Sequence, residues 1–67
     1  MLEQIFKGMT YYKVELDSKE ETEMFVSVLK KNLCPVFEVK NNIVECMIID
    51  SRELEIEKEM DKFNGLI

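Results

Sequence analysis

Residues 10–16 alternate between two sides of an extended chain. Tyr12, Val14 and Leu16 form an apolar side, and the segment is rich in the aromatic and β-branched residues that favour strands. The pattern predicts a strand with one buried face. In residues 1–9 the apolar positions recur at helical spacing instead, so we expect a short helix or an irregular N-terminal arm there.

The next segment has a helical period. Ser18 and Glu21 are the ends of a capping box, in which a side-chain oxygen and a carboxylate satisfy free amides at a helix start. Lys30 and Lys31 lie in the last turn, as the helix dipole favours. Pro35 ends the helix, because the residue before a proline avoids helical geometry. The apolar stripe expected to face the core comprises Phe25, Val28, Leu29 and Leu33.

A β-hairpin is predicted by two apolar runs on either side of Asn41 and Asn42. Asparagine tolerates the positive φ that both central positions of a type I′ turn require. A two-residue loop fixes the register and places Phe37 opposite Cys46. The side chains expected to point toward the core are Phe37, Val39, Val44, Cys46 and Ile48, and those expected to point away are Glu38, Lys40, Ile43, Glu45, Met47 and Ile49.

Asp50 is a candidate N-cap for a second helix, with Glu53 as the other member of a capping box. Leu54 lies outside the apolar stripe of this helix and is expected to be exposed or to touch a neighbour. A strand over residues 54–57 is the alternative, which the density of acidic residues and the cap make less favourable. The stripe comprises Ile56, Met60 and Phe63, with Ile67 as a further candidate.

The order strand, helix, strand, strand, helix predicts one α+β domain over residues 1–67. A right-handed crossover puts the third strand between the other two, giving a two-layer fold with a three-stranded antiparallel sheet and both helices on one face. Lys13 then lies near Glu45 and offsets the repulsion between Glu45 and Glu38. This split β-α-β arrangement resembles a ferredoxin-like fold truncated before its fourth strand, a resemblance of architecture that names no family.

The composition narrows the functional classes. A 67-residue chain has a small core, and domains of this size often gain stability from a disulfide, a metal or a second subunit. The net charge of −5 argues against direct nucleic-acid binding, which depends on clustered Lys and Arg. The sequence shows neither a membrane span nor the basic start of a signal peptide, so we expect a cytoplasmic protein. The absence of Ala suggests an AT-rich gene of bacterial, phage or archaeal origin.

Catalytic and metal chemistry find little support in the sequence. There is no His, and the two Cys lack a CxxC spacing, so neither a zinc site nor a His-activated nucleophile is predicted. In the predicted register Cys34 and Cys46 lie on opposite faces and form no disulfide. Cys46 is expected in the core, and Cys34 as a partly exposed thiol without a base to activate it. We therefore predict no enzymatic activity, metal or cofactor.

The first candidate binding surface is the acidic second helix, with Glu53, Glu55, Glu57, Glu59 and Asp61. Such positions spread around a helix, and Lys58 and Lys62 can pair with them, so a solvated helix face is the simpler interpretation. In the functional interpretation, the acids imitate nucleic-acid phosphates and dock on a basic groove of another protein.

The second candidate surface is the outer face of the sheet, where large apolar side chains are interleaved with charges. Its members are Tyr11, Val36, Ile43, Met47 and Ile49. This is more apolar surface than scattered exposure explains, so we expect something to cover it. A second copy of the chain, in a homodimer, is the preferred cover, and residues 1–9 are the alternative.

These features favour a small acidic protein–protein interaction module, an inhibitor or regulator that docks on a basic, nucleic-acid-binding partner protein. A phage-encoded inhibitor in the host cytoplasm is the most specific form of this hypothesis. The alternative is a regulatory domain that binds a small ligand at a dimer interface. The first hypothesis predicts a protein complex that salt weakens, and the second predicts stabilisation by a metabolite.

Overall fold

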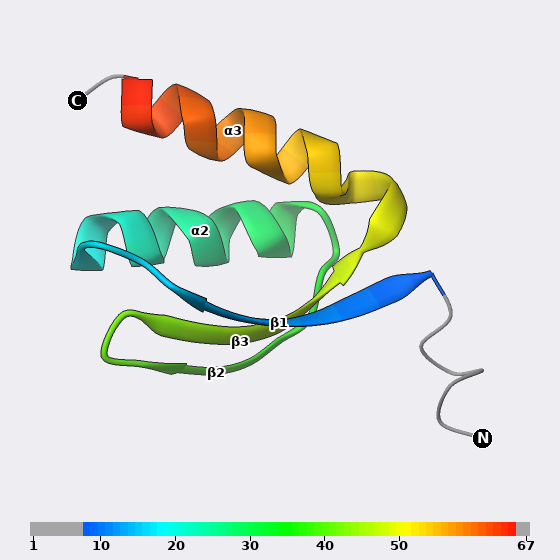
Figure 1. Cartoon of the computed structure of the whole chain (residues 1–67), viewed down its shortest axis with the longest axis horizontal. Helices are drawn as coiled ribbons and strands as arrows, with labels where there is room; N and C mark the ends of the chain where they lie inside the picture. The colour runs from blue at the N-terminus through cyan, green and yellow to red at the C-terminus, as the bar shows by residue number, and fades with distance from the viewer. Residues whose placement is uncertain (1–7, 66–67) are drawn as a thin grey trace.

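The computed structural model describes residues 8–65 and confirms the predicted α+β class. Its elements are β1 (Met9–Glu15), α2 (Lys19–Lys31), β2 (Val36–Lys40), β3 (Ile43–Ile49), a 3₁₀ turn η1 (Asp50–Arg52) and α3 (Glu53–Gly65). The strands form one antiparallel sheet in the order β1-β3-β2, and both helices lie on one side of it (Figure 1). Of the arm predicted over residues 1–9, residues 1–7 lie outside the described part, as does Ile67, and Met9 begins β1.

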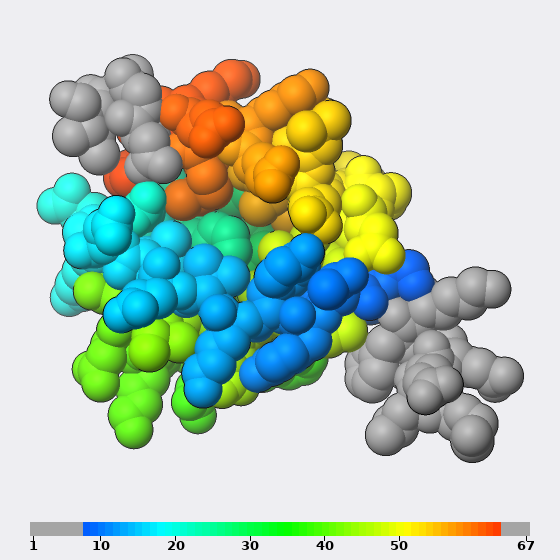
Figure 2. Space-filling model, viewed as in Figure 1, coloured from blue at the N-terminus to red at the C-terminus, as the bar shows by residue number. Residues whose placement is uncertain are grey.

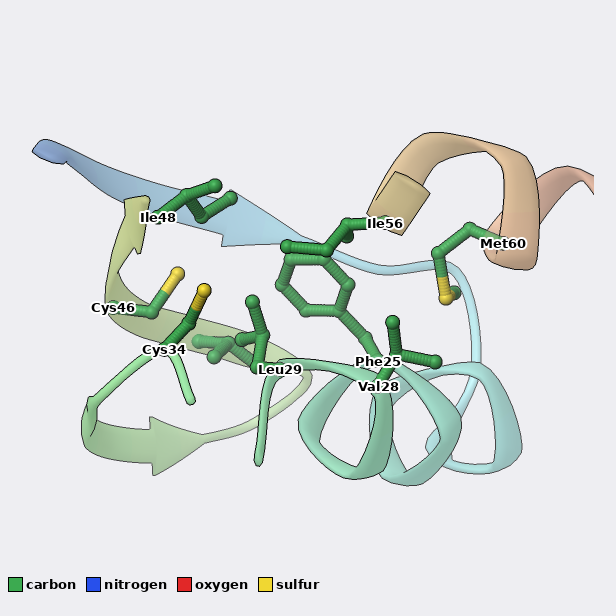
Figure 3. Packing of buried hydrophobic residues seen from close by; sticks show 9 residues of the cluster. Phe25, Val28, Leu29, Cys34, Cys46, Ile48, Ile56 and Met60 are labelled. Atoms are coloured by element: carbon green, nitrogen blue, oxygen red, sulfur yellow. The ribbon is translucent and has the colours of Figure 1, made fainter. Parts of the chain in front are cut away.

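The core lies between the helices and the inner face of the sheet (Figure 3). Its buried members are Phe25, Val28 and Leu29 of α2, Cys34, then Val44, Cys46 and Ile48 of β3, and Ile56 and Met60 of α3. Tyr12 and Val14 of β1 are only partly buried against this cluster. The central strand β3 therefore carries most of the sheet's share of the core, and β1 remains incompletely covered. No helix within residues 8–65 is long and apolar enough to cross a membrane.

The predicted capping box starts α2. The Ser18 Oγ atom accepts a hydrogen bond from the Glu21 amide at 3.1 Å, and the Glu21 carboxylate accepts one from the Asp17 amide at 2.9 Å. The Thr22 hydroxyl adds a bond to the Ser18 carbonyl at 2.7 Å and another to the Asn42 side chain at 3.1 Å. The first turn of α2 is thus tied both to its own N-terminus and to the β-hairpin.

The C-terminus of α2 differs from the sequence prediction. The Cys34 amide bonds to the Leu29 carbonyl at 2.9 Å and the Leu33 amide to the Lys30 carbonyl at 3.1 Å, which is a Schellman motif. Leu33 occupies its left-handed position, with φ of 62°, and its side chain is 77% exposed. Its predicted place in the buried stripe is therefore wrong, because α2 ends at Lys31 with Asn32 as its C-cap, and Leu33 lies beyond the helix.

The hairpin has the predicted turn. Asn41 and Asn42 have φ of 52° and 66°, and Lys40 faces Ile43 across the loop, as expected for type I′. Glu38 faces Glu45, and the Lys13 ammonium lies 3.7 Å from the Glu45 carboxylate. The predicted neighbourhood of these three charges is confirmed.

A β-bulge at Phe37 changes the other half of the predicted register. Val36 faces Cys46 instead of Met47, and it points inward and packs against the core. Phe37 is 56% exposed instead of buried. Val39, also predicted in the core, remains 48% exposed, because β2 is an edge strand. Met47, predicted to point away from the core, does lie on the outer face but is buried in the middle of the sheet.

The second predicted capping box is absent. Residues 50–52 form the η1 turn, for which no side chain caps the N-terminus, and α3 begins only at Glu53. The Asp50 carboxylate instead accepts a hydrogen bond from the Thr10 hydroxyl at 2.8 Å, and the Glu53 carboxylate accepts one from the Tyr12 hydroxyl at 3.1 Å. Both acids therefore tie the start of α3 to β1. The helical interpretation of residues 54–57 is confirmed, and Leu54 is exposed.

Candidate functional site

A groove of about 540 Å³ separates β1 from α3. It exists because α3 packs mainly beside α2 and leaves the inner side of the edge strand β1 without a full cover. Figure 2 shows the hollow between the blue atoms of β1 and the yellow and orange atoms of α3, with green α2 atoms at its base. The groove is therefore a notch in the helical layer, directly over one edge of the sheet.

The floor of the groove is apolar. Its apolar and aromatic lining residues are Tyr12, Val14 and Leu16 along β1 and just after it, Phe25 of α2, Ile48 of β3, and Ile56 and Met60 of α3. All of them belong to the hydrophobic core or pack against it, so the groove reaches down to the core instead of lying on a polar surface. A surface of this kind favours a ligand that buries apolar groups.

The rim of the groove is acidic. Within residues 8–65 its carboxylate lining residues are Glu21, Glu53, Glu57 and Asp61, and none of the lining residues in that range is Lys or Arg. Glu53, Glu57 and Asp61 follow one another at intervals of four residues and therefore lie along one side of α3. Glu21 enters from α2, where the capping box fixes its position. Four anionic groups without a cation favour a positively charged ligand.

Tyr12 joins the floor to the rim. Its hydroxyl donates to the Glu53 carboxylate across the groove, and this bond together with partial burial raises the pKa of Tyr12. Tyr12 therefore remains a neutral hydrogen-bond donor near pH 7, and its ring stands beside the carboxylates. An aromatic face next to negative charge is a favourable place for a Lys or Arg side chain.

The backbone of β1 offers a second set of contacts beside the groove. The Leu16 amide donates to the Asn42 carbonyl at 2.8 Å, and the Gly8 carbonyl accepts from the Asp50 amide at 2.8 Å, so the even-numbered positions turn toward the hairpin and η1. In an antiparallel ladder, the alternate residues then turn their amides and carbonyls the other way. For Tyr11 and Lys13 that is the open edge of the sheet.

The structure divides the five acidic residues that the sequence grouped together. Glu53, Glu57 and Asp61 line the groove, whereas Glu55 is exposed elsewhere and Glu59 forms a salt bridge with Lys31 of α2 at 3.0 Å. The sequence signal that distinguishes Glu53, Glu57 and Asp61 from the other two acids is their spacing by four residues, which places them on one side of the helix. Glu21 and Tyr12 were not among the predicted site residues, because each already had a structural explanation as a cap or a strand residue.

The predicted outer-face surface is less exposed than expected. Of its five members, Tyr11 is 53% exposed, Ile43 and Ile49 are partly buried, Met47 is buried, and Val36 belongs to the inner face. Partial desolvation and the nearby Glu45 carboxylate raise the pKa of Tyr11. The outer face therefore presents one large aromatic side chain among charges, not a broad apolar patch.

The cysteines are free, as predicted, but both are buried. Figure 3 places the Cys34 and Cys46 sulfur atoms next to each other in the core, so the expected placement on opposite faces is wrong. The Schellman turn at the end of α2 brings Cys34 inward, and the bulge at Phe37 shifts the register of β2 against β3. Burial, with a smaller contribution from Cys34, raises the pKa of the Cys46 thiol to about 11. A thiol with that pKa is a poor nucleophile near neutral pH.

Within residues 8–65, no three acidic or thiol side chains are grouped in a way that could hold a metal ion. The groove between β1 and α3, which combines an apolar floor with an acidic rim, is the candidate site. Comparison with protein-family models, curated proteins and solved structures finds no match to this chain.

Proposed function

We propose that this protein is an interaction module that binds a basic segment of a partner protein in the groove between β1 and α3. The observation that carries the proposal is the combination of an apolar floor with four carboxylates, and with no Lys or Arg among the lining residues that the structure describes. In this proposal the protein acts by docking and not by catalysis. A basic partner complements the net charge of −5, which steers association over longer range.

The groove suits an extended segment in which basic and apolar residues alternate. Apolar side chains of such a segment bury surface on Val14 and Ile56, while its Lys or Arg side chains reach Glu57 and Asp61 on the rim. The open edge of β1 supplies backbone hydrogen bonds to a segment that lies along it, which is the usual mode of strand addition. The three kinds of contact lie side by side in one place.

This chemistry also suggests a biological role. Nucleic-acid-binding proteins carry clustered Lys and Arg, and a protein that covers such a cluster prevents phosphate binding there. The domain would therefore serve as an inhibitor or regulator of a basic, nucleic-acid-binding protein. The alternative role, small-ligand binding at a dimer interface, has less support, because the groove is formed within one chain and is open to solvent.

A peptide titration tests the proposal. We expect a synthetic peptide of alternating lysine and leucine to shift the NMR amide signals of β1 and α3 around the groove, and the affinity to fall as salt is added. A peptide of alternating glutamate and leucine serves as the charge-inverted probe. It should not bind, because it brings anions to four carboxylates.

Two substitutions on α3 make a matched pair. Glu57 lines the groove and Glu55 does not, although both are exposed acids of the same helix. Glu57→Lys should weaken lysine–leucine binding at least tenfold, and Glu55→Lys, with the same change in charge, should leave it within about twofold. Equal losses in both variants would show that net charge and not the groove binds the peptide. If spermine shifted the amide signals around the groove and the lysine–leucine peptide did not, the groove would bind small cations and the peptide proposal would be wrong.

A further inference from the structure

The opposite edge of the sheet, β2, has a different surface. Three of the large hydrophobic side chains that the described chain exposes lie between the end of α2 and the end of β2, namely Leu33, Phe37 and Val39. Leu33 also holds a left-handed conformation that favours glycine, so a large apolar residue is kept there at an energetic cost. Exposed apolar residues along an unpaired edge strand indicate an interface.

The hydrogen-bonding pattern shows which residue of β2 faces outward. Lys40 and Ile43 flank the two-residue loop, so they exchange backbone hydrogen bonds with each other. Met47 is four residues after Ile43 on β3, so its backbone groups point in the same direction. Its amide donates to the Pro35 carbonyl at 3.0 Å, on the side of β2. By alternation, the amide and carbonyl of Val39 point away from β3, toward the open edge.

Val39 also lies between two opposite charges. Glu38 and Lys40 flank it, and both point to the outer face, because they face Glu45 and Ile43 there. Among residues 8–65 neither Glu38 nor Lys40 takes part in a salt bridge. Glu38 faces the like charge of Glu45, whose nearest cation, Lys13, lies on the far strand. Both charges of this edge strand therefore lack an ion-pair partner within the described residues.

We propose that a second copy of this chain pairs with β2, antiparallel, about a two-fold axis at Val39. In this register the two Val39 residues exchange both of their outward backbone hydrogen bonds, and their exposed side chains meet. Glu38 of each copy then faces Lys40 of the other, so the strand is complementary in charge to itself. This is the requirement for a closed, isologous dimer.

The dimer has a continuous six-stranded sheet with β1 at both ends and the helices of both copies on the same face. It covers the β2 edge, the surface on which an unpaired strand risks open-ended association. This inference is independent of the groove, because β2 contributes no groove-lining residue. It places the homodimer contact at the strand edge and not at the outer face of the sheet.

Sedimentation equilibrium of the full chain over a concentration series tests the dimer. We expect a species of twice the 8.0 kDa chain mass. Lys40→Glu places like charges opposite each other twice and should raise the dimer dissociation constant at least tenfold, whereas the double variant Glu38→Lys/Lys40→Glu restores opposite charges and should recover it. Lys58→Glu, an exposed site on α3 with the same change in charge, is the control and should have no effect.

A backbone variant tests the register. Val39→Pro removes the outward amide without breaking the ladder to β3, since proline is tolerated on edge strands, and it should leave a folded monomer by circular dichroism. A monomeric wild type would overturn the proposal. So would a dimer that resists Val39→Pro, or one in which the double charge variant dissociates as readily as Lys40→Glu. A dimer lost in Tyr11→Lys but retained in Val39→Pro would place the contact on the outer face instead.

Discussion

Leu33 occupies a position at which helices usually place glycine. The Schellman motif at the end of α2 requires a left-handed residue there, and Leu33 meets this requirement with φ of 62° while its side chain is mostly in solvent. A β-carbon in this region of φ and ψ clashes with the following carbonyl. Leu33 thus adds strain to the native backbone without contributing to the core.

Replacing Leu33 with glycine should therefore stabilise the fold. We expect Leu33→Gly to raise the free energy of unfolding by roughly 0.5–1 kcal/mol, which is the left-handed strain less the added entropy of an unfolded glycine. Urea denaturation at a fixed protein concentration measures the change. Leu33→Ala keeps the β-carbon and should give no such gain, so equal stabilisation by Ala and Gly would contradict the strain argument.

Cys46 is a second residue whose environment has a measurable consequence. Its folded pKa of about 11 exceeds the ordinary value of 9.0, because burial disfavours the thiolate. The folded state therefore favours the protonated thiol, and this contribution to stability is complete below pH 9. It is lost as the pH rises through about 11, because the unfolded chain then gains more by ionising.

The expected loss is about 2–3 kcal/mol, from two pKa units at one site. The comparison that isolates it is wild type against Cys46→Ala, measured by urea unfolding between about pH 8 and pH 11. Tyr11 and Tyr12, whose pKa values are also raised, titrate in both proteins and cancel. The wild type's advantage over the variant should shrink across this range, and an advantage independent of pH would show that Cys46 does not titrate in this way.

At the scale of the element, the two predicted capping boxes show what local sequence can and cannot specify. Ser18 caps α2 as its local pattern predicts, and its hydroxyl oxygen accepts from the Glu21 amide of the same turn. Asp50 had the same local pattern with Glu53, yet both acids bond to hydroxyls of β1, which is some forty residues away in sequence. A tertiary partner thus displaced the local one, and sequence spacing alone contains no sign of it.

In the sheet, too, features set by local sequence were predictable and features set by tertiary packing were not. The type I′ turn at Asn41 and Asn42 fixed the register as far as Glu38 correctly, because it depends only on turn geometry. The bulge at Phe37 was not predictable, since it depends on how the end of α2 delivers the chain to β2. The groove could be predicted only in part: the four-residue spacing of its acids is visible, but the notch between β1 and α3 is a result of packing.

The two edges of the sheet are suited to different partners. The β1 edge borders an acidic groove, and the β2 edge presents apolar side chains and one charge of each sign. Pairing of β2 with β1 of another copy would extend the sheet without closing it, whereas pairing of β2 with itself closes after two copies. In the proposed arrangement the self-complementary edge is used up in the dimer, and the β1 edge remains free for the basic partner.

At the scale of the whole molecule, a β2-to-β2 dimer would carry two acidic grooves at the far ends of one sheet. Two sites on one rigid body bind a surface with many ligands more tightly than one site does, because the second contact forms at high effective concentration. On a sensor surface densely coated with the lysine–leucine peptide, wild type should therefore dissociate at least tenfold more slowly than the monomeric Val39→Pro variant. On a sparsely coated surface the two rates should converge.

The dissociation constant for free peptide in solution separates avidity from altered chemistry. Val39→Pro leaves every groove-lining residue in place, so its affinity for one peptide should match that of wild type within about twofold. If wild type and variant dissociated equally from the dense surface while sedimentation confirmed that only the wild type is a dimer, the two grooves could not engage one surface together. The dimer would then orient its grooves toward separate partners, and dimerisation would serve the stability of the fold. A 67-residue chain has a small core, and domains of this size often need a second subunit to be stable.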